Sequence, residues 1–120
     1  MNEWKRVEIS SRVVTDGIVV VKVWGILDVF SFQDLKKYIE ELAKAAGARI
    51  VVNLSEVEYM ASAGWSVLLS KRQTIKHGGG ELSIFGMNES LRRVYDTMKI
   101  EKMLPSAVDE NGALSLVKPA

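Results

Sequence analysis

Residues 49–69 read RIVVNLSEVEYMASAGWSVLL and join two hydrophobic patterns of different period. The apolar run from Arg49 to Leu54 predicts a short buried strand. From Trp65 onward the apolar residues recur at helical spacing, so a helix is expected to start within residues 59–69. A buried strand followed by a helix is the repeating unit of α/β folds. Further strands and helices of the same kind are therefore expected on both sides of this unit.

Two strands are predicted before this unit. Asp16-Gly17 lies between β-branched runs, which favours a hairpin with two residues at positive φ. The second run, residues 19–24, is almost entirely apolar, as in a central strand covered on both faces. Gly25 is expected to end the regular part of that strand.

A first helix is predicted after these strands, with Ser31 as its cap and Gly47 at its end. Its apolar residues advance by three and four positions in turn, which defines one helical face. These residues are Phe32, Leu35, Ile39, Leu42 and Ala46.

The second helix, which begins within residues 59–69, is expected to end at the glycine run 78–80, and residues 82–85 alternate as a half-buried strand. Asn88 or Ser90 is the expected cap of a third helix. The residues expected to face inward from that helix are Leu91, Val94, Tyr95 and Met98.

The chain is predicted to finish with a short strand at residues 106–108 and a helix from an Asp109 cap through Val117. Two strands followed by alternating helices and strands indicate an α/β fold. We expect a mixed sheet of four to five strands, with about four helices packed mainly on one face. At 120 residues, residues 1–120 are expected to form a single domain.

Composition and charge exclude several function classes. Apolar residues make up 48% and charged residues 26%, as in soluble globular proteins. The net charge of +1 gives no field for binding nucleic acid directly or for binding an anionic membrane. With no cysteine, disulfides, thiolate metal sites and cysteine nucleophiles are excluded. No signal peptide or membrane-spanning run is apparent, so we expect a cytoplasmic protein without membrane insertion.

The sequence also lacks the arrangements that enzymes need. His77 is the sole histidine and lies about four helical turns, roughly 22 Å, from Ser62, so the two cannot form a catalytic pair within that helix. The glycine run 78–80 follows a helix, which is the reverse of a phosphate-binding loop. No metal-ligand spacing is present. We therefore expect neither an enzyme nor a cofactor.

Basic residues recur on the second and third predicted helices. Solvated helix faces are the favoured interpretation, and a weak patch for an acidic partner stays open. The residues are Lys71, Arg72, Lys76, Arg92, Arg93, Lys99 and Lys102.

Ser62 is a polar residue between two alanines at the predicted helix start. It could be an ordinary N-cap, or a hydroxyl whose modification switches a binding surface. The first turn of a helix accepts either a side-chain cap or a phosphate, because its N–H groups are unpaired and partly positive. Taken alone, the residues favour the cap.

Four blocks of the chain together resemble the bacterial anti-sigma factor antagonists, which are stand-alone STAS domains. The blocks are Gly25–Asp28, Ile50–Ser55, Tyr59–Gly64 and Gly79–Leu82. The resemblance spans roughly residues 7 to 117 and implies the STAS (SpoIIAA-like) fold.

By this resemblance, Ser62 matches the serine that a partner kinase phosphorylates. The unphosphorylated antagonist of this family binds the kinase, which is also the anti-sigma factor, and phosphorylation breaks the complex. Ala61, Trp65 and Ser66 stand where the family usually has aspartate, leucine and glycine. The carboxylate that the family has beside this serine is therefore absent, and the expected fold does not depend on it.

The partner surface is expected at strand-to-helix junctions on one edge of the sheet. At least one of Val29 and Phe30 is expected in the core, as is Trp65. The residues assigned to partner binding are Asp28, Val29, Phe30, Asn53, Ala61, Ser62, Ala63, Gly64, Trp65, Met87 and Asn88.

Two other functions stay open at this point. A constitutive STAS subunit of a transporter or stress-signalling complex would use Ser62 only as a cap, and Ala61 favours it. A small nucleotide-binding protein is the third. The expected oligomeric state is a monomer or weak dimer.

Overall fold

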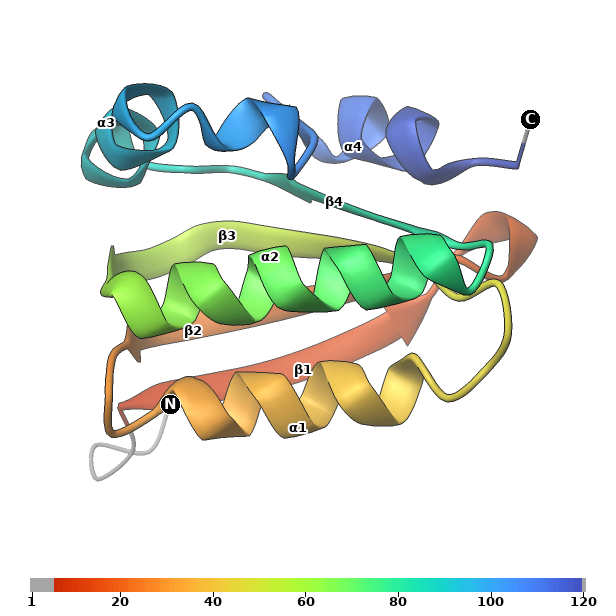
Figure 1. The fold of residues 1–120 in the computed structure, drawn as a ribbon, viewed down its shortest axis with the longest axis horizontal. Coiled ribbons are helices and arrows are strands. Elements are labelled where there is room, and N and C mark those ends of the chain that lie inside the picture. The colour runs from red at the N-terminus through yellow and green to blue at the C-terminus, as the bar shows by residue number, and fades with distance from the viewer. Residues whose placement is uncertain (1–5, 120) are drawn as a thin grey trace.

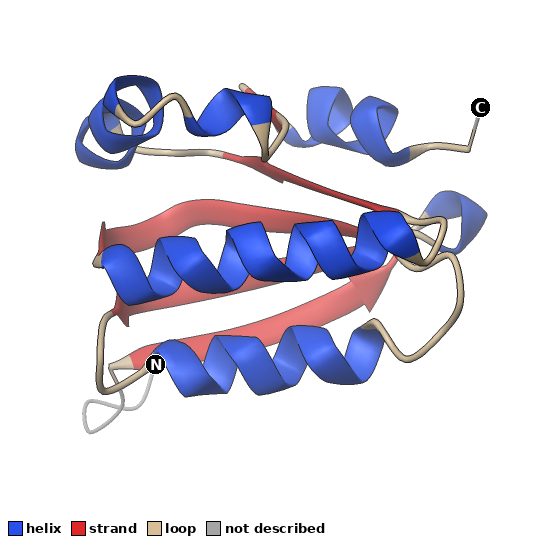
Figure 2. Ribbon diagram, viewed as in Figure 1, coloured by secondary structure: helices blue, strands red, loops and turns tan. Residues whose placement is uncertain are grey.

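The computed structural model describes residues 6–119 as a five-stranded sheet with helices on both faces (Figures 1 and 2). The strand order is β1-β2-β3-β4-β5, with β1 antiparallel to β2 and every other neighbouring pair parallel. The elements are β1 (Val7–Val13), β2 (Val19–Leu27), α1 (Phe32–Leu42), β3 (Arg49–Met60), α2 (Ser62–His77), β4 (Glu81–Phe85), α3 (Glu89–Thr97), β5 (Ser106–Ala107) and α4 (Glu110–Val117), with short 3-10 turns at Thr15–Gly17 and Ile100–Lys102. The predicted mixed sheet with four helices is confirmed.

The hairpin between β1 and β2 has the predicted backbone. Asp16 has φ of 59° and Gly17 has φ of 71°. The Val14 N–H donates to the Ile18 carbonyl over 2.8 Å, which closes the turn.

Gly25 does not end β2 as expected, because the strand continues to Leu27. The register with β3 shifts between Gly25 and Ile26, and Gly25 has φ of 105°. A Cβ at this position would lie 2.2 Å from the Arg6 carbonyl oxygen. The glycine therefore permits a close approach of the backbone rather than a strand end.

β3 is twice as long as the predicted run 49–54 and reaches Met60. Its residues Ile50 to Asn53 pair with β2 on one side and with β4 on the other. Beyond Asn53 only β2 pairs with it. This half of β3 mixes polar and apolar residues. The continuous apolar run in the sequence therefore ends at Leu54, before the strand does.

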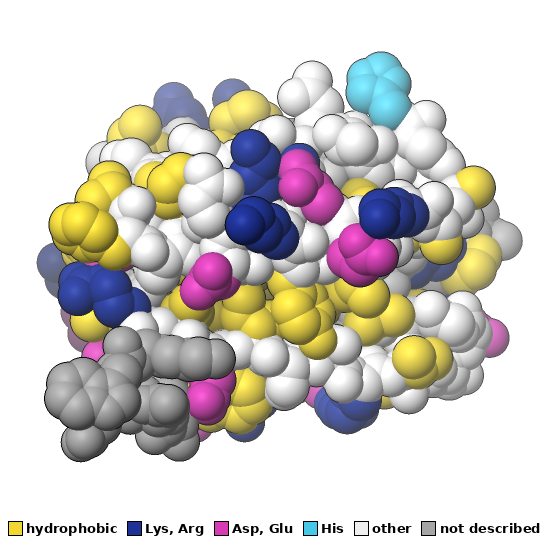
Figure 3. Space-filling model, turned by 90° about the horizontal axis from the view of Figure 1, so that it is seen from below, with side chains coloured by type: hydrophobic (Ala, Val, Ile, Leu, Met, Phe, Trp, Pro, Cys, Tyr) yellow, Lys and Arg dark blue, Asp and Glu magenta, His cyan; other side chains and the backbone are white. Residues whose placement is uncertain are grey.

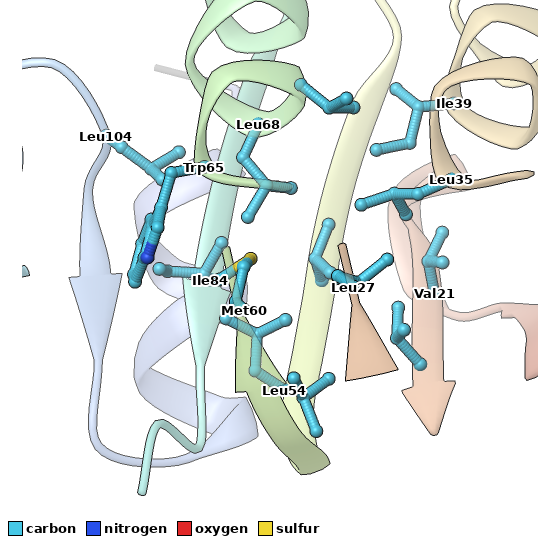
Figure 4. Packing of buried hydrophobic residues seen from close by; sticks show 14 of the residues in the cluster. Val21, Leu27, Leu35, Ile39, Leu54, Met60, Trp65, Leu68, Ile84 and Leu104 are labelled. Carbon is cyan, nitrogen blue, oxygen red and sulfur yellow. The ribbon is translucent and has the colours of Figure 1, made fainter. Parts of the chain in front are cut away.

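Two hydrophobic clusters cover opposite faces of the sheet, because neighbouring strand residues point to opposite faces. The larger cluster joins the strands to α1, α2 and α3 (Figure 4). The smaller cluster packs Ala113 and Val117 of α4 on the other face. Its strand and turn residues are Ile18, Val20, Val51 and Phe85. Three of the four helices share one cluster, in agreement with the predicted layering.

The first helix differs from the prediction at both ends. Ser31 precedes α1, but its hydroxyl makes no cap bond to the helix. It donates to the Ile26 carbonyl over 2.6 Å and accepts from the Asp28 N–H over 2.9 Å, so it closes the preceding loop. The helix ends at Leu42 rather than at Gly47.

The predicted caps of the last two helices are confirmed at Asn88 and Asp109, whose side chains accept from Leu91 and Gly112 N–H groups. Only Leu91 and Tyr95 of the third helix are buried. Val94 is 38% and Met98 66% exposed, so their predicted inward orientation is wrong. α3 has only nine residues, and its two buried side chains lie about one helical turn apart.

Among residues 6–119 there is no helix with the length and apolar character required to cross a membrane.

Candidate functional site

The ends of β2 and β3 place two loops side by side. Leu27 pairs with Met60 in the parallel register, and the Ala61 N–H donates to the Leu27 carbonyl over 2.8 Å. The loop that begins at Asp28 therefore lies next to the first turn of α2. We call this junction, formed by the exposed residues Val29, Phe30, Tyr59 and Ser62 together with the partly buried Asp28, the Ser62 surface.

Ser62 is the first residue of α2, and Ala61 occupies the N-cap position. The Ser62 side chain is exposed, and within residues 6–119 its hydroxyl makes no hydrogen bond. The interpretation of Ser62 as an ordinary cap is therefore wrong. In the same described region no acceptor is bonded to the Ser62 or Ala63 N–H groups. The first turn thus presents a free hydroxyl beside unpaired, partly positive N–H groups.

Gly64 and Trp65 are buried and belong to the support of the site rather than to its surface. A Cβ on Gly64 would lie 2.5 Å from Met60 Cγ and 3.0 Å from Leu27 Cβ. Trp65 is 5% exposed, as the prediction of a core position required, and its ring centre lies 6.2 Å from that of Tyr95. Their assignment to a partner-contacting surface is corrected accordingly.

Asp28 is held in place by Arg6. The Arg6 Nε donates to Asp28 Oδ2 over 2.8 Å, and Asp28 Oδ1 accepts from the Phe30 N–H over 2.9 Å. The Arg6 hydrogen bond lowers the pKa of the Asp28 carboxyl below its ordinary value, against the opposing effect of partial burial, and the Phe30 N–H adds to the lowering. The Asp28 side chain is therefore ionised at neutral pH, and its two hydrogen bonds hold it in place.

Val29 and Phe30 are 65% and 80% exposed, so the expectation that one of them would be in the core is wrong. The Arg6 guanidinium lies 5.5 Å from the centre of the Phe30 ring. Tyr59 adds a third apolar side chain, 55% exposed. Sequence reasoning missed Arg6, because its contact spans 22 positions and no local motif marks it.

Met87 and Asn88 lie beside β3, and the side-chain amide of the exposed Asn88 is hydrogen-bonded within the chain. The Asn88 amide donates to the Val57 carbonyl over 3.2 Å while its oxygen caps α3. Met87 is half-buried against the larger cluster. This pair anchors the start of α3.

Asn53 is not brought to the Ser62 surface. It lies seven residues before the end of β3, about 23 Å along the strand from Met60. Its Oδ1 accepts from the Ser55 N–H over 2.9 Å, at the place where β4 stops pairing and the register between β2 and β3 shifts.

Two basic side chains that were expected to be solvated are partly buried in ion pairs. Lys71 Nζ lies 2.7 Å from Glu40 of α1, and Arg72 Nε lies 2.8 Å from Glu81 of β4. Their side chains are 13% and 22% exposed. Among the described residues, no group of three potential metal ligands occurs.

Comparisons with known proteins agree on one family. The STAS domain model matches residues 11–113. An anti-sigma F factor antagonist of Paenibacillus polymyxa is 26% identical over 100 residues, covering 82% of this chain and 86% of that protein.

Solved structures share the fold. An anti-sigma factor antagonist from Mycobacterium paratuberculosis gives a TM-score of 0.83 at 21% identity, covering 94% of this chain and 95% of that one. The Bacillus protein SpoIIAA in its phosphorylated form gives 0.69 at 17% identity, covering 91% and 99%. Because the family model spans most of the chain and these structures share its architecture, the chain belongs to the STAS domain family.

Proposed function

We propose that this protein is an anti-sigma factor antagonist that binds an anti-sigma factor with serine kinase activity and is released when Ser62 is phosphorylated. The observation that carries the proposal is the exposed, unbonded hydroxyl of Ser62 at the start of α2. The similar proteins are named antagonists of anti-sigma factors, and the phosphorylated form of SpoIIAA shows that a protein of this fold carries the modification. The proposed activity is binding rather than catalysis.

The exposed apolar side chains give the Ser62 surface its binding capacity. Val29, Phe30 and Tyr59 are large and exposed, and they lie at or just beyond the adjoining ends of β2 and β3. Clustered aromatic side chains next to charged groups are typical of the centres of protein interfaces. Asp28 and Arg6 add a fixed ion pair that orients a partner.

Phosphorylation would transfer the terminal phosphoryl group of ATP to Ser62 Oγ. The bond to the β-phosphate oxygen breaks, ADP leaves, and the hydroxyl proton passes to a base of the kinase. The product carries about −1.5 to −2 charges at the start of α2. The helix tolerates this charge because its free N–H groups point towards it.

The same charge opposes docking. A phosphate buried in an interface without a matched cation costs several kcal/mol, which corresponds to a hundredfold or greater loss of affinity. The scaffold therefore keeps its shape while the partner is released.

Ala61 leaves the helix without a side-chain cap, where the resemblance leads one to expect an aspartate. Its carbonyl still accepts from the Gly64 N–H over 2.9 Å, so the first turn forms. The missing cap carboxylate leaves the N–H groups of Ser62 and Ala63 available to a phosphate. Phosphorylated Ser62 would supply acceptor oxygens and negative charge near these N–H groups.

The test uses the full chain and the anti-sigma factor kinases of its own host, each with labelled ATP. Wild type and Ser66→Ala are expected to take up one phosphate group, and Ser62→Ala none. Ser66 is the matched control because it is another exposed serine of α2, one turn away. Equal labelling of wild type and Ser62→Ala, or labelling of neither, contradicts the proposal.

Binding is measured in the same system. Unmodified wild type is expected to form a complex with the kinase, and ATP is expected to dissociate it. A complex that forms but persists after ATP would indicate a constitutive STAS subunit, and the switch would be wrong.

A further inference from the structure

The two edges of the sheet differ in length. β5 has two residues, whereas β1 has seven and pairs with β2 in an unbroken register. No described strand pairs with the outer side of β1. Its sequence, VEISSRV, contains neither proline nor lysine, two residues that commonly protect an edge strand from pairing.

The hydrogen bonds of the hairpin show which backbone groups face this open edge. The Arg6 carbonyl accepts from the Ile26 N–H, and the Val14 N–H donates to the Ile18 carbonyl, each over 2.8 Å. In an antiparallel pair, alternate residues direct both groups to the same neighbour. The N–H and carbonyl groups of the even-numbered residues of β1 are therefore directed towards β2. The groups directed outward belong to Val7, Ile9, Ser11 and Val13.

The β1 sequence is complementary to itself in the antiparallel direction. If Ser10 lies opposite its own copy, Val7 lies opposite Val13, Ile9 opposite Ser11 and Glu8 opposite Arg12. The outward-facing residues then meet each other, so every outward N–H and carbonyl of the strand gains a partner. We propose that a second copy of this chain docks on β1 in this register, which joins two sheets into one across a two-fold axis at Ser10.

Charge selects this register. Glu8 and Arg12 occupy non-hydrogen-bonded positions of the new pair, where Cα atoms are about 4.5 Å apart and side chains are closest. The two-fold axis repeats the pair, so two opposite-charge contacts form. Arg12 already contacts Glu110 of α4, and Glu8 of the second copy would approach the same guanidinium.

The surface next to β1 carries both apolar and charged side chains. A groove of about 510 Å³ runs between β1 and α1, lined by Val7, Ile9 and Tyr38. Figure 3 views the molecule from this side and shows hydrophobic side chains in a band between charged ones. The charged lining comes from Glu8, Asp34, Lys37 and Glu41. Docking of a second copy would cover part of this band, which adds apolar burial to the strand pairing.

Sedimentation equilibrium of the full chain over micromolar to millimolar concentrations tests the proposal. Wild type is expected to dimerise, and either Arg12→Glu or Glu8→Arg to weaken the dimer by about tenfold, because like charges then face each other twice. An equimolar mixture of the two variants should restore dimerisation, since only the mixed dimer pairs opposite charges. Wild type that stays monomeric at millimolar concentration overturns the proposal, as does a dimer that the charge changes leave unaffected.

A cross-link tests the register independently of these charges. The chain has no cysteine, so Ser10→Cys introduces the single thiol. Its Cα atoms would meet at about 4.5 Å, which is within disulfide range. Mild oxidation should yield a disulfide dimer for Ser10→Cys and not for the exposed control Ser66→Cys. Equal cross-linking of both variants, or of neither, contradicts the register. Phosphorylation plays no part in this readout.

Discussion

Gly64 sets how closely α2 approaches the sheet. A methyl group at this position would lie 2.5 Å from Met60 Cγ, in a region without space to accept it. Alanine is the better helix former by about 1 kcal/mol, so an exposed site would gain stability from the same change.

Gly64→Ala is therefore expected to lower the free energy of unfolding by about 1–3 kcal/mol, because the overpacking outweighs the helix propensity. Urea denaturation measures this. Gly78→Ala is the control at the other end of the helix. Its added Cβ meets nothing nearer than 3.5 Å, and a change below about 0.5 kcal/mol is expected. A loss of the same size in both variants would show that close packing at Gly64 is not the cause.

Arg6→Ala is expected to raise the pKa of Asp28 towards its ordinary value, because the Arg6 hydrogen bond is the largest cause of the lowering. Carboxyl chemical shifts followed by NMR through an acid titration measure it. Lys37→Ala, a change elsewhere on the surface, should leave the Asp28 titration unchanged. An unaltered Asp28 titration in Arg6→Ala would contradict the assignment.

At this scale the core position of Trp65 was predictable from its place on a helical stripe. The roles of Ser62 and Asp28 come from a resemblance and stay predictions. Val29 and Phe30 could not be placed, because apolar character alone does not distinguish a core residue from an interface residue. Arg6 acts across 22 positions, and a contact of that kind has no periodic signature.

The contact between α2 and β4 depends on a partly buried charge cluster. Glu81 accepts from Arg72 over 2.8 Å and from Lys76 over 3.2 Å, and its own side chain is 10% exposed. Burial raises the pKa of Glu81, but hydrogen bonds from Arg72, the Leu82 N–H and Lys76 outweigh it and bring the pKa to about 2. The ionised form is thus the one that holds the helix to the strand.

The pH dependence follows from the lowered pKa. The contribution is complete above the ordinary value of 4.5 and is lost as the pH falls to about 2. Glu81→Gln is expected to lower the free energy of unfolding at pH 7 by on the order of 3 kcal/mol, and the difference from wild type should shrink across that window.

Urea denaturation of both proteins at several pH values measures this difference. Glu41→Gln is the control, since the Glu41–Lys44 pair is more than 70% exposed on both sides and contributes little. A constant difference between pH 7 and pH 2 would contradict the role of ionised Glu81.

The sequence predicted the existence and order of the elements, and it erred mainly at their ends. The predicted β3 ended close to the point where β4 stops pairing with it. Gly25 was predicted to end a strand, whereas it permits a close approach of the backbone to Arg6. Both errors arise from tertiary neighbours, which local patterns do not record. The Asn88 and Asp109 caps were predictable because the cap residue bonds within its own helix.

Across the whole molecule, α4 completes a second core on the far side of the sheet. Val117 is fully buried there with Ile18, Val20, Val51 and Phe85. The layered α/β architecture was predictable from the alternation of patterns. The position of this helix on the opposite face was not, because its sequence does not say which face it will meet.

Val117→Ala is expected to lower the free energy of unfolding by about 2 kcal/mol, through lost burial and the cavity that remains. Val108→Ala, at a position that is 85% exposed, should change it by less than about 0.5 kcal/mol. Chemical denaturation followed by circular dichroism compares the two. Equal effects would show that the second core adds nothing to overall stability.

The tight seating of α2 also determines what form of substrate a kinase must recognise. Since Gly64 lies against Leu27 and Met60, the first turn of α2 cannot easily unwind to offer Ser62 as an extended strand. A kinase that phosphorylates this hydroxyl therefore has to recognise the folded surface of the protein around Ser62. A synthetic peptide copying residues 57–70 is accordingly expected to be a far poorer phosphate acceptor than the intact chain, which a side-by-side labelling assay would measure.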